Sequence, residues 1–119
     1  MQSFLVNETN TRVRFLQPFG FFDFITLEKN ALCVLSDSGT VQEECALSQV
    51  PSVTLREVTE RRETLEKGCN ILGGPDPALI GSCVDKVLSR RFPGKAPPGY
   101  SQDNVSEVVT NLVLGFHLF

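Results

Sequence analysis

The sequence predicts an α/β fold in which a parallel sheet is flanked by helices. Short apolar runs alternate along the chain with longer segments of helical periodicity, which is the order that a parallel sheet requires. The apolar run at 33–35 shows no alternation of polar and apolar residues, as is typical of a strand that is buried on both faces. The length of 119 residues and the apolar content of 41% are sufficient for one domain.

The first half of the chain is predicted to contain two strands and two helices. Alternating charged and apolar residues indicate the first strand, and an aromatic turn follows it. A continuous apolar run that ends at Ser36 indicates the second strand. In chain order, the predicted elements are a strand at 12–17, a helix from Asp23 to about Ala31, a strand at 33–35 and a helix at 41–49.

Polar residues mark the starts of these two helices. Asp23 is the expected cap of the first helix. Thr40 and Glu43 have capping-box spacing for the second helix, and Ser38 is a second candidate cap. The expected apolar side of the first helix contains Phe24, Leu27 and Leu32.

The second half of the chain is predicted to contain two strands and three helices. Pro51 opens the third strand, at a point where no ladder N–H is needed. Asp76 followed by Pro77 is a clear helix start, because it combines an N-cap with a proline in the first turn. The predicted elements are a strand at 51–55, a short helix to Lys67 that Gly68 stops, a strand at 70–72, a helix from Asp76, a loop at 92–102 and a last helix capped by Asp103 or Asn104, with an apolar face from Val105 to Phe116.

Charge and hydropathy exclude several kinds of partner. The net charge is −3, whereas nucleic-acid binders usually carry a basic excess. No apolar stretch approaches the roughly 18 residues of a membrane span. Residues 1–11 are polar and lack the basic and apolar regions of a signal peptide. We therefore expect no nucleic-acid partner, no membrane partner and a cytoplasmic location.

The cysteines and the single histidine do not form a metal-binding pattern. No C-x-x-C pair occurs, and His117 lies near the end of the chain. Each cysteine has apolar neighbours, which is typical of a reduced cysteine in the core. We therefore expect no metal, no cofactor and four core positions at Cys33, Cys45, Cys69 and Cys83.

The segment 36–40, Ser-Asp-Ser-Gly-Thr, joins a predicted strand to a predicted helix. In an open parallel sheet, ligands bind at the carboxyl ends of the strands. Free N–H groups and the helix dipole favour an anion there, and Gly39 allows close approach of the backbone. Ser38 and Thr40 add hydroxyl groups. Plain N-capping explains the same residues equally well, so both interpretations stay open.

Two further loops at the same edge of the sheet contain candidate ligand groups. Four aromatic residues between Phe19 and Phe24 offer a ring for stacking on a base, although at least two are expected in the core. Arg56, Arg61 and Arg62 lie among glutamates. Arginine suits phosphate, but a surface ion-pair network of little energetic value explains this spacing equally well.

Glu44 lies inside the helix that follows the 36–40 turn. A carboxylate near a bound nucleotide can accept hydrogen bonds from two ribose hydroxyls, but a solvated helix charge explains Glu44 better on spacing alone. The adjacent Glu43 is expected to be solvated. No Ser-His-Asp or Cys-His arrangement for nucleophilic catalysis is available in the sequence.

Four motifs together resemble the C-terminal domain of the non-hydrolysing UDP-N-acetylglucosamine 2-epimerases. The resemblance runs from about Arg12 to Phe116, and it rests on the combination and spacing of the motifs. The motifs are Gly-Phe-Phe-Asp-Phe at 20–24, Cys-Val-Leu-Ser-Asp-Ser-Gly-Thr at 33–40, Glu-Glu at 43–44 and Thr-Glu-Arg-Arg-Glu at 59–63.

The resemblance implies a Rossmann-like domain that forms part of the C-terminal half of a glycosyltransferase-B-like, two-domain architecture. Family members invert C2 of a UDP-linked N-acetyl amino sugar: a proton leaves C2, UDP is eliminated, and UDP adds back with the opposite configuration. The C-terminal domain mainly holds UDP. By position, the resemblance implies that Phe24 lies beside the uracil and that Glu44 binds the ribose. The diphosphate is bound by the turn that contains Ser38, Gly39 and Thr40. Arg61 corresponds to the arginine of the family's Glu-Arg-Pro-Glu motif.

This chain departs from the family pattern in three respects. Arg62 replaces the usual proline, which is expected to loosen the loop that carries Arg61. Thr40 replaces a second glycine, as in the branch that acts on modified sugars of surface polysaccharides. The N-terminal half of the family, with the acid/base carboxylates and a catalytic histidine, is expected to be absent from this chain. We therefore expect no catalytic residue in this chain, no activity of the chain alone, and a partner that is either the missing domain or a second copy.

The expected organisation is a polar segment at 1–11, an incomplete UDP-binding domain at 12–91, a loop at 92–102 and a helix at 103–119. One alternative is a non-catalytic remnant that binds UDP or interacts with another chain. A second alternative is a fragment of a glycosyltransferase-B-type transferase, against which the Glu-Arg-x-Glu segment at 60–63 argues.

Overall fold

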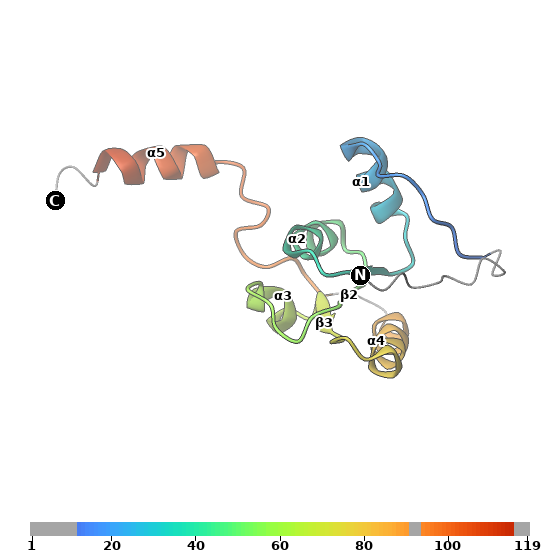
Figure 1. Ribbon diagram of the computed structural model, residues 1–119. Helices are drawn as coiled ribbons and strands as arrows, with labels where there is room; N and C mark the ends of the chain where they lie inside the picture. The colour runs from blue at the N-terminus through green and yellow to red at the C-terminus, as the bar shows by residue number, and fades with distance from the viewer. Residues whose placement is uncertain (1–11, 91–93, 116–119) are drawn as a thin grey trace, which may run out of the picture.

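A computed structural model describes residues 12–90 and 94–115 of the chain. Helices and strands alternate from the first helix to the fourth, which confirms the predicted α/β class (Figure 1). The elements are α1 (Phe21–Lys29), β1 (Val34–Ser36), α2 (Gly39–Ser48), β2 (Ser52–Thr54), α3 (Arg62–Glu66), β3 (Asn70–Leu72), α4 (Pro77–Ser89) and α5 (Val105–Gly115).

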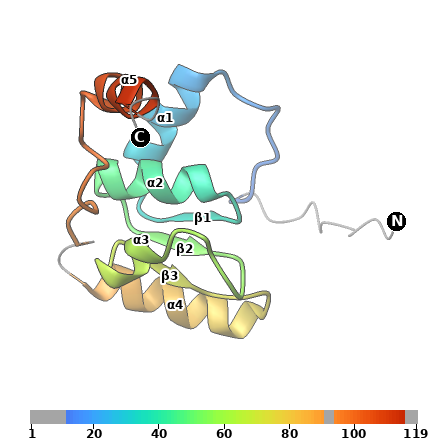
Figure 2. The same cartoon turned by 90° about the vertical axis from the view of Figure 1, so that its left-hand side faces the viewer.

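The strands form one parallel sheet in the order β1–β2–β3. Leu35 of β1 pairs with Val53 of β2, and Val53 pairs with Ile71 of β3. Figure 2 shows the sheet between two helical layers, with α1 and α2 on one side and α4 on the other. A helix lies in each connection between neighbouring strands, as parallel pairing requires.

The core lies on both faces of β2, whose three residues are all buried. Two clusters of buried side chains fill it: Val41, Cys45 and Val50 on the α2 side, and Val53, Cys83 and Val87 on the α4 side. All four cysteines are free thiols. The expected core positions are confirmed for Cys45, Cys69 and Cys83, whereas Cys33 is half-buried.

Gly73, directly after β3, leaves no room for a side chain. A Cβ at this position would lie 2.9 Å from Cγ1 of Val53 and 3.4 Å from Cγ1 of Ile80. We expect Gly73→Ala to lower the free energy of unfolding by about 1–2 kcal/mol, because overpacking forces core side chains out of their rotamers. Urea unfolding measures this change.

Gly81→Ala is the matched control for this prediction, since a Cβ at Gly81 in α4 meets no atom within 4 Å. Alanine has a higher helix propensity than glycine, so the free energy of unfolding of this variant is expected to be unchanged or slightly higher. Equal destabilisation of the two variants would show that crowding at Gly73 is not the cause.

The predicted strand at 12–17 is wrong. These residues are exposed and form no strand in the structure. Backbone N–H and C=O groups of a strand need a neighbouring strand, and among the described residues β1 pairs with β2 alone. The alternating sequence pattern therefore has no ladder to join.

The first helix begins earlier than the sequence predicts. α1 starts at Phe21 with Gly20 as its N-cap, so the predicted cap Asp23 lies inside the first turn. A carboxylate in that turn still interacts favourably with the helix dipole. α4, by contrast, begins as predicted, because Oδ1 of Asp76 accepts a hydrogen bond from the Ala78 N–H at 3.1 Å.

The expected apolar side of α1 is not buried in the structure. Phe24 is 39% exposed and Leu27 is 53% exposed, whereas Glu28 is only 4% exposed. Phe19, Phe21 and Phe22 are more exposed than Phe24, so the prediction of at least two core aromatics is wrong for the described structure. The side of α1 that faces α2 is the one that becomes buried.

The last helix, α5, stands apart from the sheet (Figure 1). None of its residues is buried, and Leu112 is 67% exposed. Its predicted apolar face therefore has no covering surface among residues 12–90 and 94–115. His117 and the other residues after Gly115 lie outside the described residues. No helix in the described part of the chain is long and apolar enough to cross a membrane.

Candidate functional site

The turn between β1 and α2 presents a helix start that no side chain caps. The Ser38 N–H donates to Oγ of Ser36 at 3.1 Å, which shapes the turn. Ser38 is the N-cap residue by position, but its side chain makes no capping hydrogen bond. Thr40 lies inside the first turn, so the capping box predicted with Glu43 is wrong. Because the first N–H groups of a helix lack intrahelical acceptors, this start favours an anion.

Arg61 places its guanidinium group at the same turn. A Cβ on Gly39 would lie 3.6 Å from Cζ and 3.7 Å from Nη2 of Arg61. Nε of Arg61 donates a hydrogen bond to Oε1 of Glu43 in α2, and the two side chains form an ion pair. This hydrogen bond and the charge of Glu43 raise the pKa of the Arg61 guanidinium. Since the pair uses Nε, Nη2 beside Gly39 is suited to contact a phosphate oxygen.

A buried hydrogen-bond network holds the loop that carries Arg61. The Arg61 N–H donates to Oγ1 of Thr59 at 3.0 Å, and this hydroxyl donates to Oε1 of Gln42 at 2.8 Å. Nδ2 of Asn70, in β3, donates to the same Gln42 oxygen at 3.3 Å. Thr59, Gln42 and Asn70 are all buried. The position of Arg61 therefore depends on polar groups inside the core.

The other side of the loop is held by α3 and by the segment after α4. The hydroxyl of Thr64 donates to the Arg61 carbonyl oxygen at 2.7 Å. The Tyr100 hydroxyl donates to Oε1 of Glu63 at 2.6 Å. This bond lowers the pKa of Glu63, while burial and Glu63 raise the pKa of Tyr100. Arg62 is the first residue of α3, a position that also suits proline.

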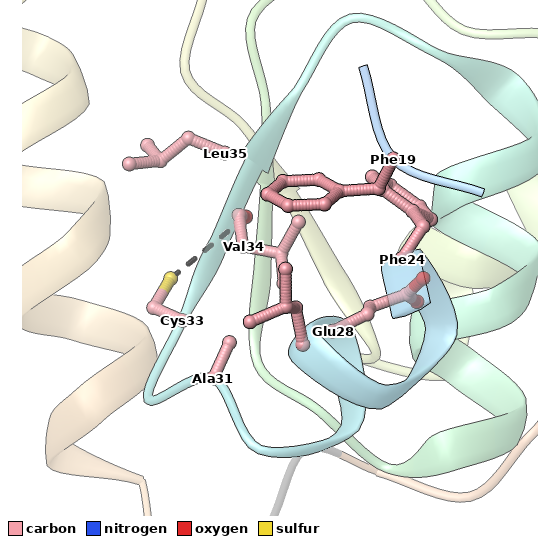
Figure 3. Close-up of a pocket in the computed structure, with 8 residues that line it drawn as sticks. Phe19, Phe24, Glu28, Ala31, Cys33, Val34 and Leu35 are labelled. Carbon is pink, nitrogen blue, oxygen red and sulfur yellow. Dashed lines mark hydrogen bonds between the residues drawn. The ribbon is translucent and has the colours of Figure 1, made fainter. Parts of the chain in front are cut away.

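Phe24 lies in a pocket between α1 and β1 (Figure 3). The pocket has a volume of about 280 Å³, and Phe19, Phe24, Glu28 and Val34 are among its lining residues. Its walls are mostly apolar, with the Glu28 carboxylate as the charged group in the lining. Apolar and aromatic walls of this kind suit a planar ring.

Glu44 lies in a separate groove of about 440 Å³ between α1 and α2. Phe22, Lys29 and Leu47 also line this groove. Burial raises the pKa of Glu44, and the negative charge of Glu28 raises it further. Glu44 is thus only partly exposed in this groove.

The structure brings together two of the six residues that the sequence singled out, Gly39 and Arg61. Ser38 and Thr40 flank Gly39 in the chain, while Phe24 and Glu44 line the two hollows beside α1. Arg56 instead forms an exposed ion pair with Glu60 at 3.9 Å. The interpretation as a surface ion pair, and not as a phosphate ligand, therefore applies to Arg56.

Sequence reasoning missed several residues that hold the site, among them Glu43, Thr59 and Tyr100. Glu43 is expected to be solvated, but it pairs with Arg61 across a separation of 18 residues. Thr59 falls inside a quoted motif without a role, and Tyr100 carries no sequence signal at all. The one hint of this pair in the sequence is that Glu43 and Glu44 have side chains of equal length. Either of them could therefore pair with one of the arginines at 56, 61 and 62.

An uncapped helix start at the carboxyl end of a parallel strand, with an arginine beside it, is typical of phosphate-binding α/β domains. A sequence model of UDP-N-acetylglucosamine 2-epimerase matches residues 2–114. The chain is 42% identical over 108 residues, 91% of its length, to the UDP-N-acetylglucosamine 2-epimerase of Methanococcus maripaludis. It is 38% identical over 105 residues to that of Methanocaldococcus jannaschii. The chain belongs to the UDP-N-acetylglucosamine 2-epimerase family.

Solved structures of this family share the fold. The Methanocaldococcus jannaschii UDP-GlcNAc 2-epimerase in complex with UDP-GlcNAc and UDP matches 87% of this chain, with a TM-score of 0.74 and 36% identity. The Neisseria meningitidis UDP-GlcNAc 2-epimerase bound to UDP-GlcNAc matches 84%, with a TM-score of 0.64 and 25% identity. The predicted resemblance and the Rossmann-like, glycosyltransferase-B-like fold are confirmed. The chain spans 29% of the length of the two curated methanogen relatives.

Proposed function

We propose that this chain is the UDP-binding part of a UDP-sugar 2-epimerase. The observation that carries the proposal is the uncapped start of α2 beside the Arg61 guanidinium. Backbone N–H groups, a helix dipole and a delocalised cation meet there, and a diphosphate can accept hydrogen bonds from all of them. The UDP-GlcNAc and UDP bound to the related Methanocaldococcus jannaschii enzyme support UDP as the ligand.

In this proposal each candidate residue binds one part of UDP. Ser38, Gly39, Thr40 and Arg61 bind the diphosphate, Glu44 accepts hydrogen bonds from the ribose, and Phe24 packs against the uracil ring. UDP is the leaving group of the reaction and also its returning nucleophile. Donors that are fixed in place around the diphosphate therefore stabilise the charge that develops as the sugar–phosphate bond breaks.

Inversion at C2 also needs groups that remove and return a proton. We assign these groups to the part of the family's fold that this chain does not span, so the chain alone is proposed to bind UDP without catalysing epimerisation. Its partner is then the remaining part of a family enzyme or a second copy. The proposed organisation keeps UDP binding at 12–91 and a separate helix at 103–119. The UDP-linked amino sugar would serve polysaccharide biosynthesis in the cytoplasm.

Amide NMR of the whole chain during titration with UDP tests the binding site. UDP at millimolar concentration is expected to shift the amides of Gly39, Thr40 and Val41, because these N–H groups would donate to phosphate oxygens. The amide of Ala78 is an internal control, since its N–H already donates a hydrogen bond to the Asp76 side chain. Uridine, which has no phosphates, should leave the turn unchanged. No shift of the turn with UDP would refute the proposed site.

Incubation with UDP-GlcNAc tests the division of labour. The chain alone is expected to produce neither the manno epimer nor free UDP. Epimer formation by the purified chain would show that its own residues move the proton, and would overturn the assignment of catalysis to the remaining part of the fold.

A further inference from the structure

The segment at 94–102, which we call the strap, packs on the protein near the loop that carries Arg61. Figures 1 and 2 show it beside α3, before the chain continues to α5. Pro97 of the strap is buried, whereas α5 has no buried residue. Of these two parts of the chain, the strap is therefore the one that is docked on the sheet and its helices.

Backbone contacts dock the first part of the strap on the chain between α3 and β3. A Cβ at Gly94 would overlap the carbonyl oxygen of Lys67, so the two backbones approach closely. The thiol of Cys69 donates to the carbonyl oxygen of Lys95, with Sγ at 3.1 Å from it. The strap therefore begins from a fixed point on the fold.

Tyr100 makes the side-chain contact between the strap and α3. Its hydroxyl donates to Oε1 of Glu63 at 2.6 Å, and a hydrogen bond to a charged acceptor is stronger than one between neutral groups. The Tyr100 N–H donates to the Pro97 carbonyl oxygen at 3.2 Å and closes a turn through Pro98 and Gly99. Gly99 has a φ of 92°, and a type II turn requires a positive φ at this position. The sequence Pro-Pro-Gly-Tyr therefore favours the observed position of Tyr100.

Glu63 connects this contact to Arg61. Arg61 is the N-cap residue of α3, and Glu63 lies in the first turn of this helix. The carbonyl oxygen of Arg61 accepts from the Thr64 N–H at 3.0 Å and from the Thr64 hydroxyl at 2.7 Å. A displacement of this turn would therefore move the backbone of Arg61, whose guanidinium lies beside Gly39.

We propose that Tyr100 is a positioning residue for Arg61, and that docking of the strap and binding of UDP stabilise each other. The second part rests on the proposed function. UDP contacts the side chain of Arg61, and the docked strap holds the first turn of α3 through Glu63. Coupling between two equilibria is reciprocal, so UDP stabilises the docked strap by the same factor by which docking strengthens UDP binding. Tyr100 itself does not contact UDP.

Tyr100→Phe removes the hydroxyl and keeps the ring. The strap is then expected to be docked in about half to about a tenth of the molecules, so that UDP binds about two- to tenfold more weakly. Titration calorimetry measures this loss. Ser101→Ala is the matched control, because it removes a hydroxyl from the next residue, which is exposed. Its UDP affinity is expected to equal that of the unaltered chain.

A second background tests whether Tyr100 acts through Glu63. Glu63→Met removes the acceptor and keeps a side chain of similar length, so Tyr100→Phe has no bond to break in this background. The effect of Tyr100→Phe on UDP affinity is therefore expected to disappear there. The general effect of the lost Glu63 charge cancels, because both proteins in this comparison carry the same substitution.

Amide hydrogen exchange of the unaltered chain measures the reciprocal effect without any substitution. Saturating UDP is expected to slow the exchange of the Tyr100 and Gln102 amides, which donate to carbonyl oxygens within the strap. The Val108 amide, which donates to the Asn104 carbonyl oxygen at the start of α5, is the internal control. Its exchange rate should be the same with and without UDP. Without UDP, Tyr100→Phe should speed the exchange of the strap amides.

The proposal is supported if Tyr100→Phe loses affinity only when Glu63 is present, and if UDP slows exchange in the strap. Unchanged affinity in Tyr100→Phe, or equal losses in both backgrounds, overturns the positioning role. UDP binding that leaves strap exchange unchanged overturns the coupling. An unaltered chain that binds no UDP at millimolar concentration refutes the proposed function and the coupling with it. Faster strap exchange in Tyr100→Phe would then still support docking through Glu63.

Discussion

Arg61→Gln is expected to weaken UDP binding by about 10- to 100-fold, because a hydrogen bond to a charged group contributes about 1.5–3 kcal/mol. The Arg61 guanidinium lies beside Gly39, with Nη2 at 3.7 Å from where a Cβ would be. Glutamine keeps a donor but loses the charge and the fork geometry that matches phosphate. Titration calorimetry with UDP measures the loss. The UDP affinity of Arg61→Lys is expected to lie between those of the unaltered chain and Arg61→Gln, since lysine keeps the charge but not the fork geometry.

Arg62→Gln is the matched control for Arg61, because it removes the same charge from the next residue. Arg62 is exposed at the start of α3, and a screened surface charge is expected to change the affinity by less than about threefold. Equal losses in both variants would mean that general electrostatics attract UDP. Stability should barely change in Arg61→Gln, since solvent screens a partly exposed ion pair such as Arg61–Glu43.

Asn70→Leu is expected to lower the free energy of unfolding by about 2–4 kcal/mol, because it leaves the buried Thr54 hydroxyl without its partner and removes one hydrogen bond each from Ser52 and Gln42. Nδ2 of Asn70 donates to Oγ1 of Thr54 at 2.7 Å, and Oδ1 accepts from Oγ of Ser52 at 3.4 Å. Thr54 and Ser52 are 1% and 4% exposed, so water cannot replace the lost bonds. Urea unfolding followed by circular dichroism measures the effect.

The same substitution is expected to reach the UDP site. Asn70 shares the Gln42 oxygen with Thr59, and Thr59 accepts from the Arg61 N–H. Loss of the Asn70 amide should therefore shift the Arg61 amide signal in the folded protein and weaken UDP binding by a few-fold. An unchanged Arg61 amide would show that the network does not position this loop.

A double-mutant cycle separates the polar network from simple packing. Thr54→Val removes the hydroxyl while keeping the shape, and the double variant with Asn70→Leu replaces both partners by apolar groups. Because the cost comes mainly from the partner left unsatisfied, the double variant is expected to lose less stability than the sum of the single variants. Additive losses would indicate that packing alone explains the effect of Asn70.

Local signals were sufficient for the elements whose ends are encoded by adjacent residues. The strand at Asn70–Leu72 and the Asp76–Pro77 start of α4 agree with the sequence, because a turn after the strand and an N-cap act within a few residues. The other strands and α2 are present with bounds that shift by one or two residues. The isolated alternation at 12–17 is no strand, because a ladder needs a neighbour that no local pattern provides.

The sequence by itself determined the fold class, the family and the turn at 36–40, since these depend on periodicity and on motifs of adjacent residues. Only the tertiary structure decided that Ser38 leaves the start of α2 uncapped and that Arg61 lies over Gly39, paired with Glu43. It also decided that Glu28 is buried beside Cys45, whereas the apolar side of α1 stays exposed. Each of these contacts joins separate elements or depends on three-dimensional side-chain geometry, so spacing along the chain could not reveal it.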